Sequence, residues 1–142
     1  MKVCTHHGHD LVILTRNEHC PPHIHVGSTK WAARFTFSFW ENHVQLWDVV
    51  PEQNMPSTSI LDALQTTLAE PANLRKAREL WWKALGSVCL DNKYWDTKKN
   101  EVIETKGRRT NAEQIHSALF HPKTYRTTFL ISPSEQEVEI QL

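Results

Sequence analysis

The chain lacks a net charge, a long hydrophobic run and a CxxC motif. Its 142 residues include 16 basic and 16 acidic side chains, so the formal charges cancel. A chain without net charge produces no overall field that would attract nucleic acid or an acidic partner. No apolar run approaches the roughly 20 residues of a membrane span, and we expect no contact with a membrane.

The three cysteines, Cys4, Cys20 and Cys89, form no CxxC pair, and their number is odd. The beginning of the sequence shows no apolar signal segment. Together these two absences predict a protein of the reducing cytoplasm. The length is that of one domain that can bury a core of its own.

What stands out instead is a run of histidines and prolines, His-Cys-Pro-Pro-His-Ile-His-Val, from His19 to Val26. Each proline fixes its own φ angle and favours an extended conformation in the residue before it, so the segment is stiff. Successive side chains of a strand point to opposite faces. His23 and His25 would therefore share one face, while Ile24 and Val26 would share the other.

The stretch 31–40 alternates large apolar residues with polar or small ones. This pattern predicts a second strand with one apolar face. A four-residue loop at 27–30 would join it to the histidine strand, with Val26 opposite Trp31. The two strands would then place their apolar side chains on the same face.

A two-residue turn at 41–42 would start a third strand, with Val44 opposite Phe39. The result is a three-stranded antiparallel meander with one apolar face. Its other face would carry His23, His25, Arg34 and Trp47.

Two amphipathic helices are expected to cover the apolar face. The first starts at a capping-box-like Ser59 and ends near Leu68. The second begins at Pro71 and stops at Gly86. An antiparallel sheet covered on one face by two helices is an α+β fold, and residues 1–86 would form it.

Residues 87–142 are predicted to form a C-terminal α/β extension packed on that core, so that 1–142 is a single domain. Its expected strands lie at 88–90, 101–105, 124–131 and 137–142. Thr110 and Glu113 have the spacing of a capping box, which predicts a helix from Ala112 to Leu119.

The octet at 19–26 resembles the signature of an uncharacterised bacterial domain family: His-x-Pro-Pro-His, an apolar residue, then His-Val. The resemblance extends to the short apolar strand before the motif, the alternating strand after it, and a later helix with two tryptophans at 81–82. It implies a small protein similar to components of toxin–antitoxin-like gene pairs. This sequence departs from the family in Cys20 and in the residues after Leu85.

The histidines of the octet suggest a metal site. Neutral imidazoles are common ligands of zinc and similar divalent transition metals, and two of them on one strand face the same way. The predicted ligands are His19, His23 and His25, with Cys20 or a histidine of the His6-His7-His9 cluster as alternatives to His19. The same histidines could instead hold the proline turn through hydrogen bonds. The octet contains no acidic residue that could serve as ligand or base, which argues against metalloenzyme chemistry.

Two further surfaces are candidates for binding. On the histidine face, Arg34 and Trp47 could stack a base or a peptide side chain, unless later residues cover them. A local excess of basic residues follows residue 93 and could contact nucleic acid, or could be only a solvated loop. Its candidate residues are Lys98, Lys99, Lys106, Arg108 and Arg109.

A rival interpretation is a magnesium-dependent nuclease. The sequence Glu104-Thr105-Lys106 ends a predicted strand, with Asp91 or Asp96 upstream. Two acids that hold a metal and a nearby lysine would fit that chemistry.

We therefore expect a small cytoplasmic binding or regulatory protein that engages a protein partner. The contact would use the histidine face or the basic extension, and the extension could also contact nucleic acid. The alternative is a metal-dependent hydrolase or nuclease.

Overall fold

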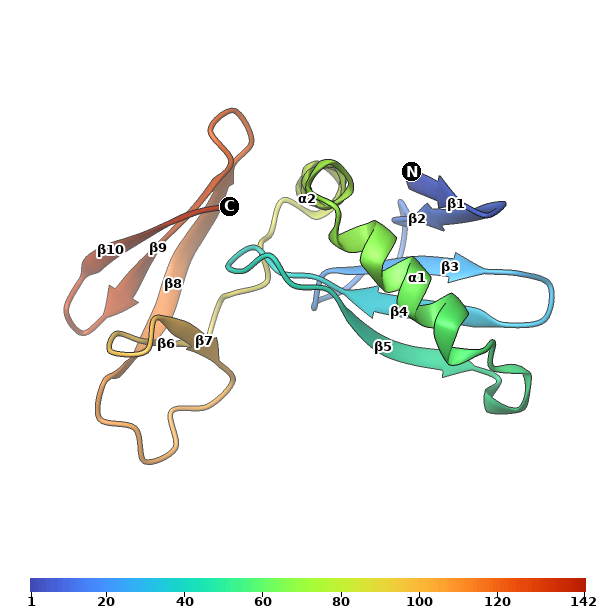
Figure 1. Ribbon diagram of the computed structural model, residues 1–142. Helices are drawn as coiled ribbons and strands as arrows, with labels where there is room; N and C mark the ends of the chain where they lie inside the picture. The colour runs from blue at the N-terminus through green and yellow to red at the C-terminus, as the bar shows by residue number, and fades with distance from the viewer. The chain divides into compact units, whose positions relative to one another are not determined.

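The computed structural model describes residues 1–142, which form two compact units, Met1–Gly86 and Ser87–Leu142 (Figure 1). The boundary lies where the sequence analysis placed the junction between core and extension. Neither of the two helices has the length and apolarity that crossing a membrane requires.

The first unit contains an antiparallel sheet in which sequence neighbours are also spatial neighbours, in the order β1-β2-β3-β4-β5. The strands are β1 (Lys2–His6), β2 (His9–Val12), β3 (His23–Gly27), β4 (Ala32–Thr36) and β5 (Gln45–Val50). The predicted meander is therefore confirmed as β3-β4-β5, and a hairpin of β1 and β2 extends it on one side.

The pairing of β3 with β4 differs from the prediction by two residues. Val26 lies opposite Ala33 rather than Trp31, and His25 lies opposite Arg34. The last pair is Gly27 with Ala32, and the Ser28 amide donates to the Trp31 carbonyl across a tighter turn. A shift of two residues keeps every side chain on its predicted face, because the period of a strand is two.

The predicted two-residue turn at 41–42 is wrong. Strand β4 ends at Thr36, which pairs with Gln45, and residues 37–44 form a longer connection. The buried Arg78 holds this connection by donating to the carbonyls of Ser38 and Glu41. The prediction failed because hydrogen bonds from the distant Arg78 support a loop that local alternation does not reveal.

The pairing of β4 with β5 contains a bulge. Phe35 pairs with Leu46 and Arg34 pairs with Asp48, so Trp47 is the extra residue on β5. Both Trp47 and Asp48 accompany Arg34 on the histidine face, as their contacts below show. Bulges re-aim side chains and are frequent beside functional sites.

Two helices follow the sheet, α1 (Thr58–Ala69) and α2 (Pro71–Leu85), joined at Glu70. A 3-10 turn, η1 (Glu52–Asn54), precedes them. The first helix starts earlier than predicted, because the Ser57 side chain caps it by accepting from the Ile60 amide. The second ends at Gly86 in a left-handed conformation, φ 63°, as predicted.

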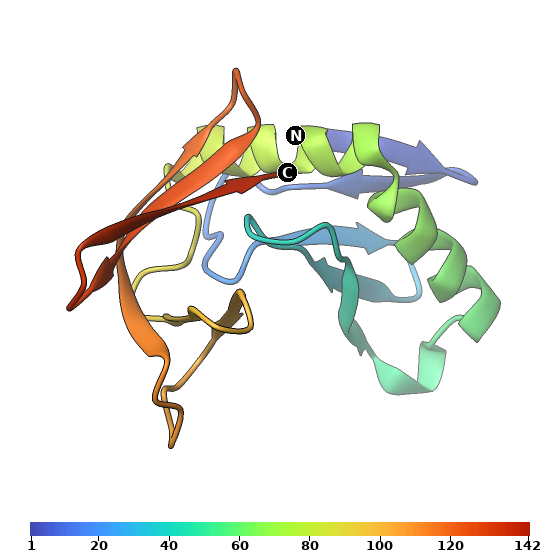
Figure 2. The same ribbon diagram turned by 60° about the vertical axis from the view of Figure 1, so that its left-hand side comes forward.

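The core lies between these helices and the apolar face of the sheet. Helix α1 contacts both edge strands, and α2 contacts β1 (Figures 1 and 2). The largest fully buried side chains of this core include Phe35 and Ile24 on the sheet and Leu64 and Trp81 on the helices. The α+β architecture is thus confirmed.

The second unit is an antiparallel sheet in the order β10-β9-β8-β6-β7. Its strands are β6 (Tyr94–Asp96), β7 (Glu101–Ile103), β8 (Ala112–His121), β9 (Arg126–Ser132) and β10 (Gln136–Gln141). The terminal hairpin of β9 and β10 and the strand at 101–103 were predicted. No strand forms at 88–90.

The predicted helix at 112–119 is wrong, since these residues belong to β8. A bulge lies between His116 and Leu119, where Ser117 has a φ of 54°. It interrupts the alternation of the strand, so the apolar residues acquire a spacing that resembles a helix. Glu113 does not cap anything; its carboxylate accepts from the Ser134 amide at 2.7 Å.

Candidate metal centre

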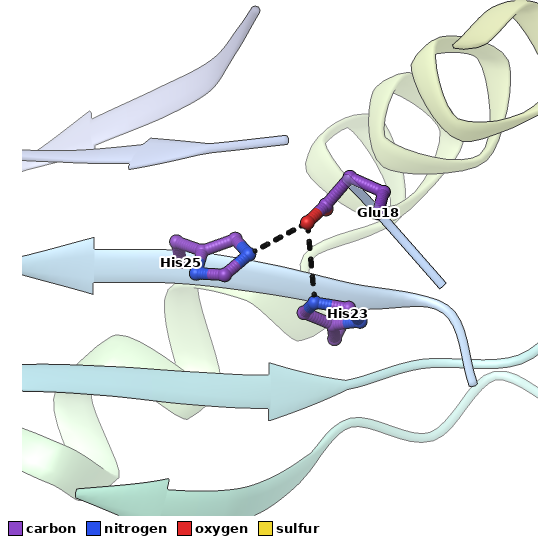
Figure 3. Close-up of side chains that lie close together, drawn as sticks. All are labelled: Glu18, His23 and His25. Atoms are coloured by element: carbon purple, nitrogen blue, oxygen red, sulfur yellow. Dashed lines mark hydrogen bonds and ion pairs between the residues drawn. The ribbon is translucent and has the colours of Figure 1, made fainter. Parts of the chain in front are cut away.

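Glu18, His23 and His25 bring their polar atoms together at the start of β3 (Figure 3). His23 and His25 share a face of the strand, as predicted, because side chains two apart on a strand point the same way. Glu18 belongs to the loop between β2 and β3, which folds back so that its carboxylate points at both rings. One carboxylate and two imidazoles therefore converge.

One oxygen of the carboxylate contacts both histidines. Glu18 Oε1 lies 3.0 Å from Nε2 of His25 and 3.4 Å from Nε2 of His23. The side chains of Glu18 and His23 are almost completely buried, at 3% and 2% exposed, whereas that of His25 is 28% exposed. The site is thus buried on two sides and open to solvent at His25.

The other ring nitrogen of His23 determines its tautomer. Nδ1 lies 2.7 Å from the carbonyl oxygen of Pro21, and a carbonyl can only accept, so Nδ1 carries the proton. In the neutral ring, Nε2 then presents a lone pair to the Glu18 carboxylate. Two electron-rich atoms face each other unless a proton or another cation lies between them.

A proton is disfavoured there by burial. Removal of the ring from water lowers the pKa of His23 below its ordinary value, and the positive charges of His25 and Arg34 act in the same direction. The hydrogen bond to Pro21 and the charge of Glu18 oppose this shift without overcoming it. The neutral form, with its free lone pair, is therefore favoured at neutral pH.

The second oxygen of Glu18 is also unsatisfied. Oε2 is buried and has no hydrogen-bond partner. Buried charges in proteins are normally paired, hydrogen-bonded or bound to a metal, because an uncompensated charge is costly. A cation between Glu18 and His23 would neutralise the carboxylate and would also accept the lone pair of His23 Nε2.

The distances fit a small divalent ion. Tetrahedral zinc with bonds of about 2.0 Å holds its ligand atoms about 3.3 Å apart. The two distances from Glu18 Oε1, 3.0 and 3.4 Å, bracket this value, and all three ligand atoms lie within 4.8 Å of one another.

The bond from His23 to Pro21 matches what metal ligands usually show. A ligating histidine generally donates its other N–H to a carbonyl or carboxylate, which fixes the ring and its tautomer. Rings of Trp81 and Trp47, with centroids 5.4 and 5.2 Å from that of His23, brace it further. The ring is therefore oriented before any ion arrives.

Sequence reasoning named two of the three side chains that lie together and missed the third. The structure does not place His19 in the cluster; its side chain is exposed, and its Nδ1 contacts the Cys20 carbonyl at 3.1 Å. Glu18, one residue before the octet, supplies the acid that the octet lacks. The signal that could have found it is its position, directly before the stiff proline segment.

Comparison with known proteins found no protein-family model, no curated protein and no solved structure that matches this chain. The chemistry of the site therefore carries the functional argument.

Arg34 and Trp47 lie beside the histidines as expected, but Arg34 is already engaged. Its guanidinium forms a two-pronged salt bridge with Asp48 and lies 4.0 Å from the centroid of the Trp47 ring. This salt bridge lowers the pKa of Asp48 and raises that of Arg34. Trp47 remains 38% exposed, so this pair forms a rim next to the cluster.

The basic residues of the second unit separate into two groups. Lys98, Lys99, Arg108 and Arg109 line one pocket, whereas Lys106 does not. The magnesium pattern gains no support, because Glu104 pairs with Lys93 and Asp96 pairs with Arg109. The side chains whose ligand atoms lie close enough together to hold a metal ion are instead Glu18, His23 and His25.

Proposed function

We propose that the first unit binds a divalent transition-metal ion, zinc in the first instance, through Glu18, His23 and His25. One observation carries the proposal: the nearly buried carboxylate of Glu18 lies 3.4 Å from Nε2 of His23, a ring whose Nδ1 is already engaged with the Pro21 carbonyl. The unsatisfied Oε2 supports the same conclusion.

The ligand set points to a reactive centre rather than a purely structural one. Structural zinc sites have four protein ligands, whereas hydrolytic sites have three and leave a position for water or substrate. A metal in such a site polarises an oxygen atom and lowers the pKa of bound water. The site therefore fits metal-dependent hydrolysis, and the exposed edge of His25 is where a substrate would enter.

The test is metal binding by the metal-free protein. Zinc would be titrated calorimetrically after chelator treatment, and cobalt absorption would report nitrogen and oxygen ligands. We expect one ion per chain in the wild type and a loss of more than about 100-fold in affinity for Glu18→Gln and His23→Gln. Removal of partners that only orient ligands already costs about 10- to 100-fold.

Two matched controls keep the test specific. His19→Gln changes the neighbouring exposed histidine, and His43→Gln changes an exposed histidine in the connection before β5. Both should bind the metal as the wild type does. Equal loss in the controls, or zinc binding that survives Glu18→Gln and His23→Gln, would refute the proposed centre.

A second candidate function is partner binding at the rim next to the cluster. Exposed tryptophan and arginine side chains are enriched among residues that dominate protein interfaces. Trp47 is 38% exposed beside Arg34, which favours a protein partner at this surface. Trp47→Ala should release a partner that is captured with the wild type.

A further inference from the structure

The second unit contains a basic pocket that is independent of the metal centre. Its volume is about 230 Å³, and four of its lining residues are Lys98, Lys99, Arg108 and Arg109. The lysines come from the turn between β6 and β7, and the arginines come from the loop before β8. Two loops therefore supply cations to one place.

A buried acid organises the pocket. Asp96 is 4% exposed, and its Oδ1 accepts from the amides of Lys98 and Lys99 at 3.0 and 2.9 Å. Its Oδ2 accepts from Nη1 of Arg109 at 3.0 Å. These bonds lower the pKa of Asp96 and fix the turn that carries both lysines.

The cations outnumber the acids. Nη1 of Arg109 also donates to Glu101 at 2.6 Å, so Asp96 and Glu101 together offset two of the four positive charges. Lys98, Lys99 and Arg108 form no ion pair, and their side chains are exposed. The pocket has positive charge available for an anion.

The remaining lining residues indicate which anion. Thr110 and Asn111 add a hydroxyl and an amide, and no aromatic or aliphatic side chain lines the pocket. A site for a free nucleotide would need a surface on which the base could stack, and a membrane site would need apolar side chains to insert. A purely polar, cationic pocket suits phosphates and sugars, which is how proteins hold a nucleic-acid backbone without reading its sequence.

We propose that this pocket binds backbone phosphates of nucleic acid, independently of base sequence. The phosphates are contacted by Lys98, Lys99 and Arg108. The side chain of Arg109 is held in place by Asp96 and Glu101 and forms one side of the pocket. Hydrogen bonds to the same oxygens or to the sugar come from Thr110 and Asn111. The affinity should be modest, with dissociation constants of about 10⁻⁴–10⁻⁶ M at physiological salt.

The experiment measures fluorescence anisotropy of labelled oligo-dT, oligo-rU and a DNA duplex with the full chain, across a series of potassium chloride concentrations. The logarithm of affinity should fall with the logarithm of salt, with a slope of about −2 for three phosphate contacts on a single strand. Lys98→Ala, Lys99→Ala and Arg108→Ala should each reduce this slope by about 0.7. The three oligomers distinguish single strands from duplex.

Lys123→Ala is the matched control, because Lys123 is exposed in the same unit but does not line the pocket. It should leave the slope unchanged. The double variant Lys98→Arg, Lys99→Arg keeps both positive charges and should retain binding. Absence of binding by the wild type at 50 mM salt and about 100 μM protein would overturn the proposal. So would an equal loss in Lys123→Ala, or preferential binding to vesicles of anionic phospholipid.

Discussion

Two nearly buried carboxylates, one in each unit, behave in opposite ways. Asp96 accepts hydrogen bonds from two backbone amides and from an arginine side chain, so both of its oxygens are satisfied. Glu18 shares one oxygen between two histidines and leaves the other without a partner. A satisfied buried acid organises structure, whereas an unsatisfied one requires an explanation, and for Glu18 we propose a bound metal ion.

The surroundings of the two acids differ as well. The Glu18 site is braced by aromatic rings, since Trp47 and Trp81 both contact His23. The Asp96 site is braced by hydrogen bonds within a turn. Removal of packing should therefore damage the first site, and removal of charge should damage the second.

The largest expected effect comes from Trp81→Ala. Trp81 is fully buried, with its ring 5.4 Å from that of His23 and 6.1 Å from that of Phe37. Its truncation should lower the free energy of unfolding of the first unit by about 3–5 kcal/mol, because transfer energy is lost and a cavity remains. Urea unfolding measures this cost.

Trp47→Ala is the control for packing, because that ring is partly exposed. It should cost clearly less than Trp81→Ala. Equal costs would show that the site is not braced from the helix side.

The next effect compares the two acids directly. In the absence of metal, Glu18→Gln should raise the free energy of unfolding by about 1–3 kcal/mol, because it removes a buried charge with an unsatisfied oxygen while the amide oxygen can still accept from His25. Asp96→Asn should lower the melting temperature, since it weakens bonds to Lys98, Lys99 and Arg109. Thermal unfolding of both variants in the presence of a chelator checks that the first is more stable, and the second less stable, than the wild type.

Zinc should reverse the difference in stability between Glu18→Gln and the wild type. A ligand that binds only the folded state stabilises it in proportion to the logarithm of its concentration. The wild type should then melt above Glu18→Gln. A fall in melting temperature for Glu18→Gln without metal would mean that the carboxylate is a structural acid like Asp96.

The sequence predicted the parts of the first unit that depend on periodicity. The face shared by His23 and His25 and the helix from Pro71 to Gly86 are examples. It failed where a distant contact decides the structure, as at residues 37–44, which Arg78 holds. A bulge at Ser117 likewise concealed β8.

The site was predictable only in part for the same reason. Two histidines of one strand share a face by geometry alone. Glu18 joins them because its loop folds back, and no local pattern reports such a return. The basic pocket depends on Asp96 in the same way, since one buried acid draws two loops together.

A smaller effect concerns pH. Hydrogen bonds from the Lys99 amide, Arg109 and the Lys98 amide keep the pKa of Asp96 below its unfolded value of about 3.9. The stabilisation is therefore fully present above pH 4 or so and is lost as pH falls through the lower, folded value. The second unit of Asp96→Asn should lack this part of the acid transition in circular dichroism titrations, whereas Glu113→Gln should keep it.

The smallest effect concerns the rim next to the cluster. Arg34→Gln removes a salt bridge whose side chains are 31% and 34% exposed, together with the stacking on Trp47. Exposed salt bridges contribute about 0–1 kcal/mol and exposed cation–π pairs about 0.5–1 kcal/mol, so the loss in free energy of unfolding should stay near 1 kcal/mol. Arg16→Gln, at an exposed position of the loop that carries Glu18, is the control.

Zinc affinity of Arg34→Gln should rise slightly, because a positive charge near His23 and Glu18 disappears. Loss of zinc binding would instead place Arg34 and Asp48 among the groups that shape the centre, and the boundary between cluster and rim would have to be redrawn.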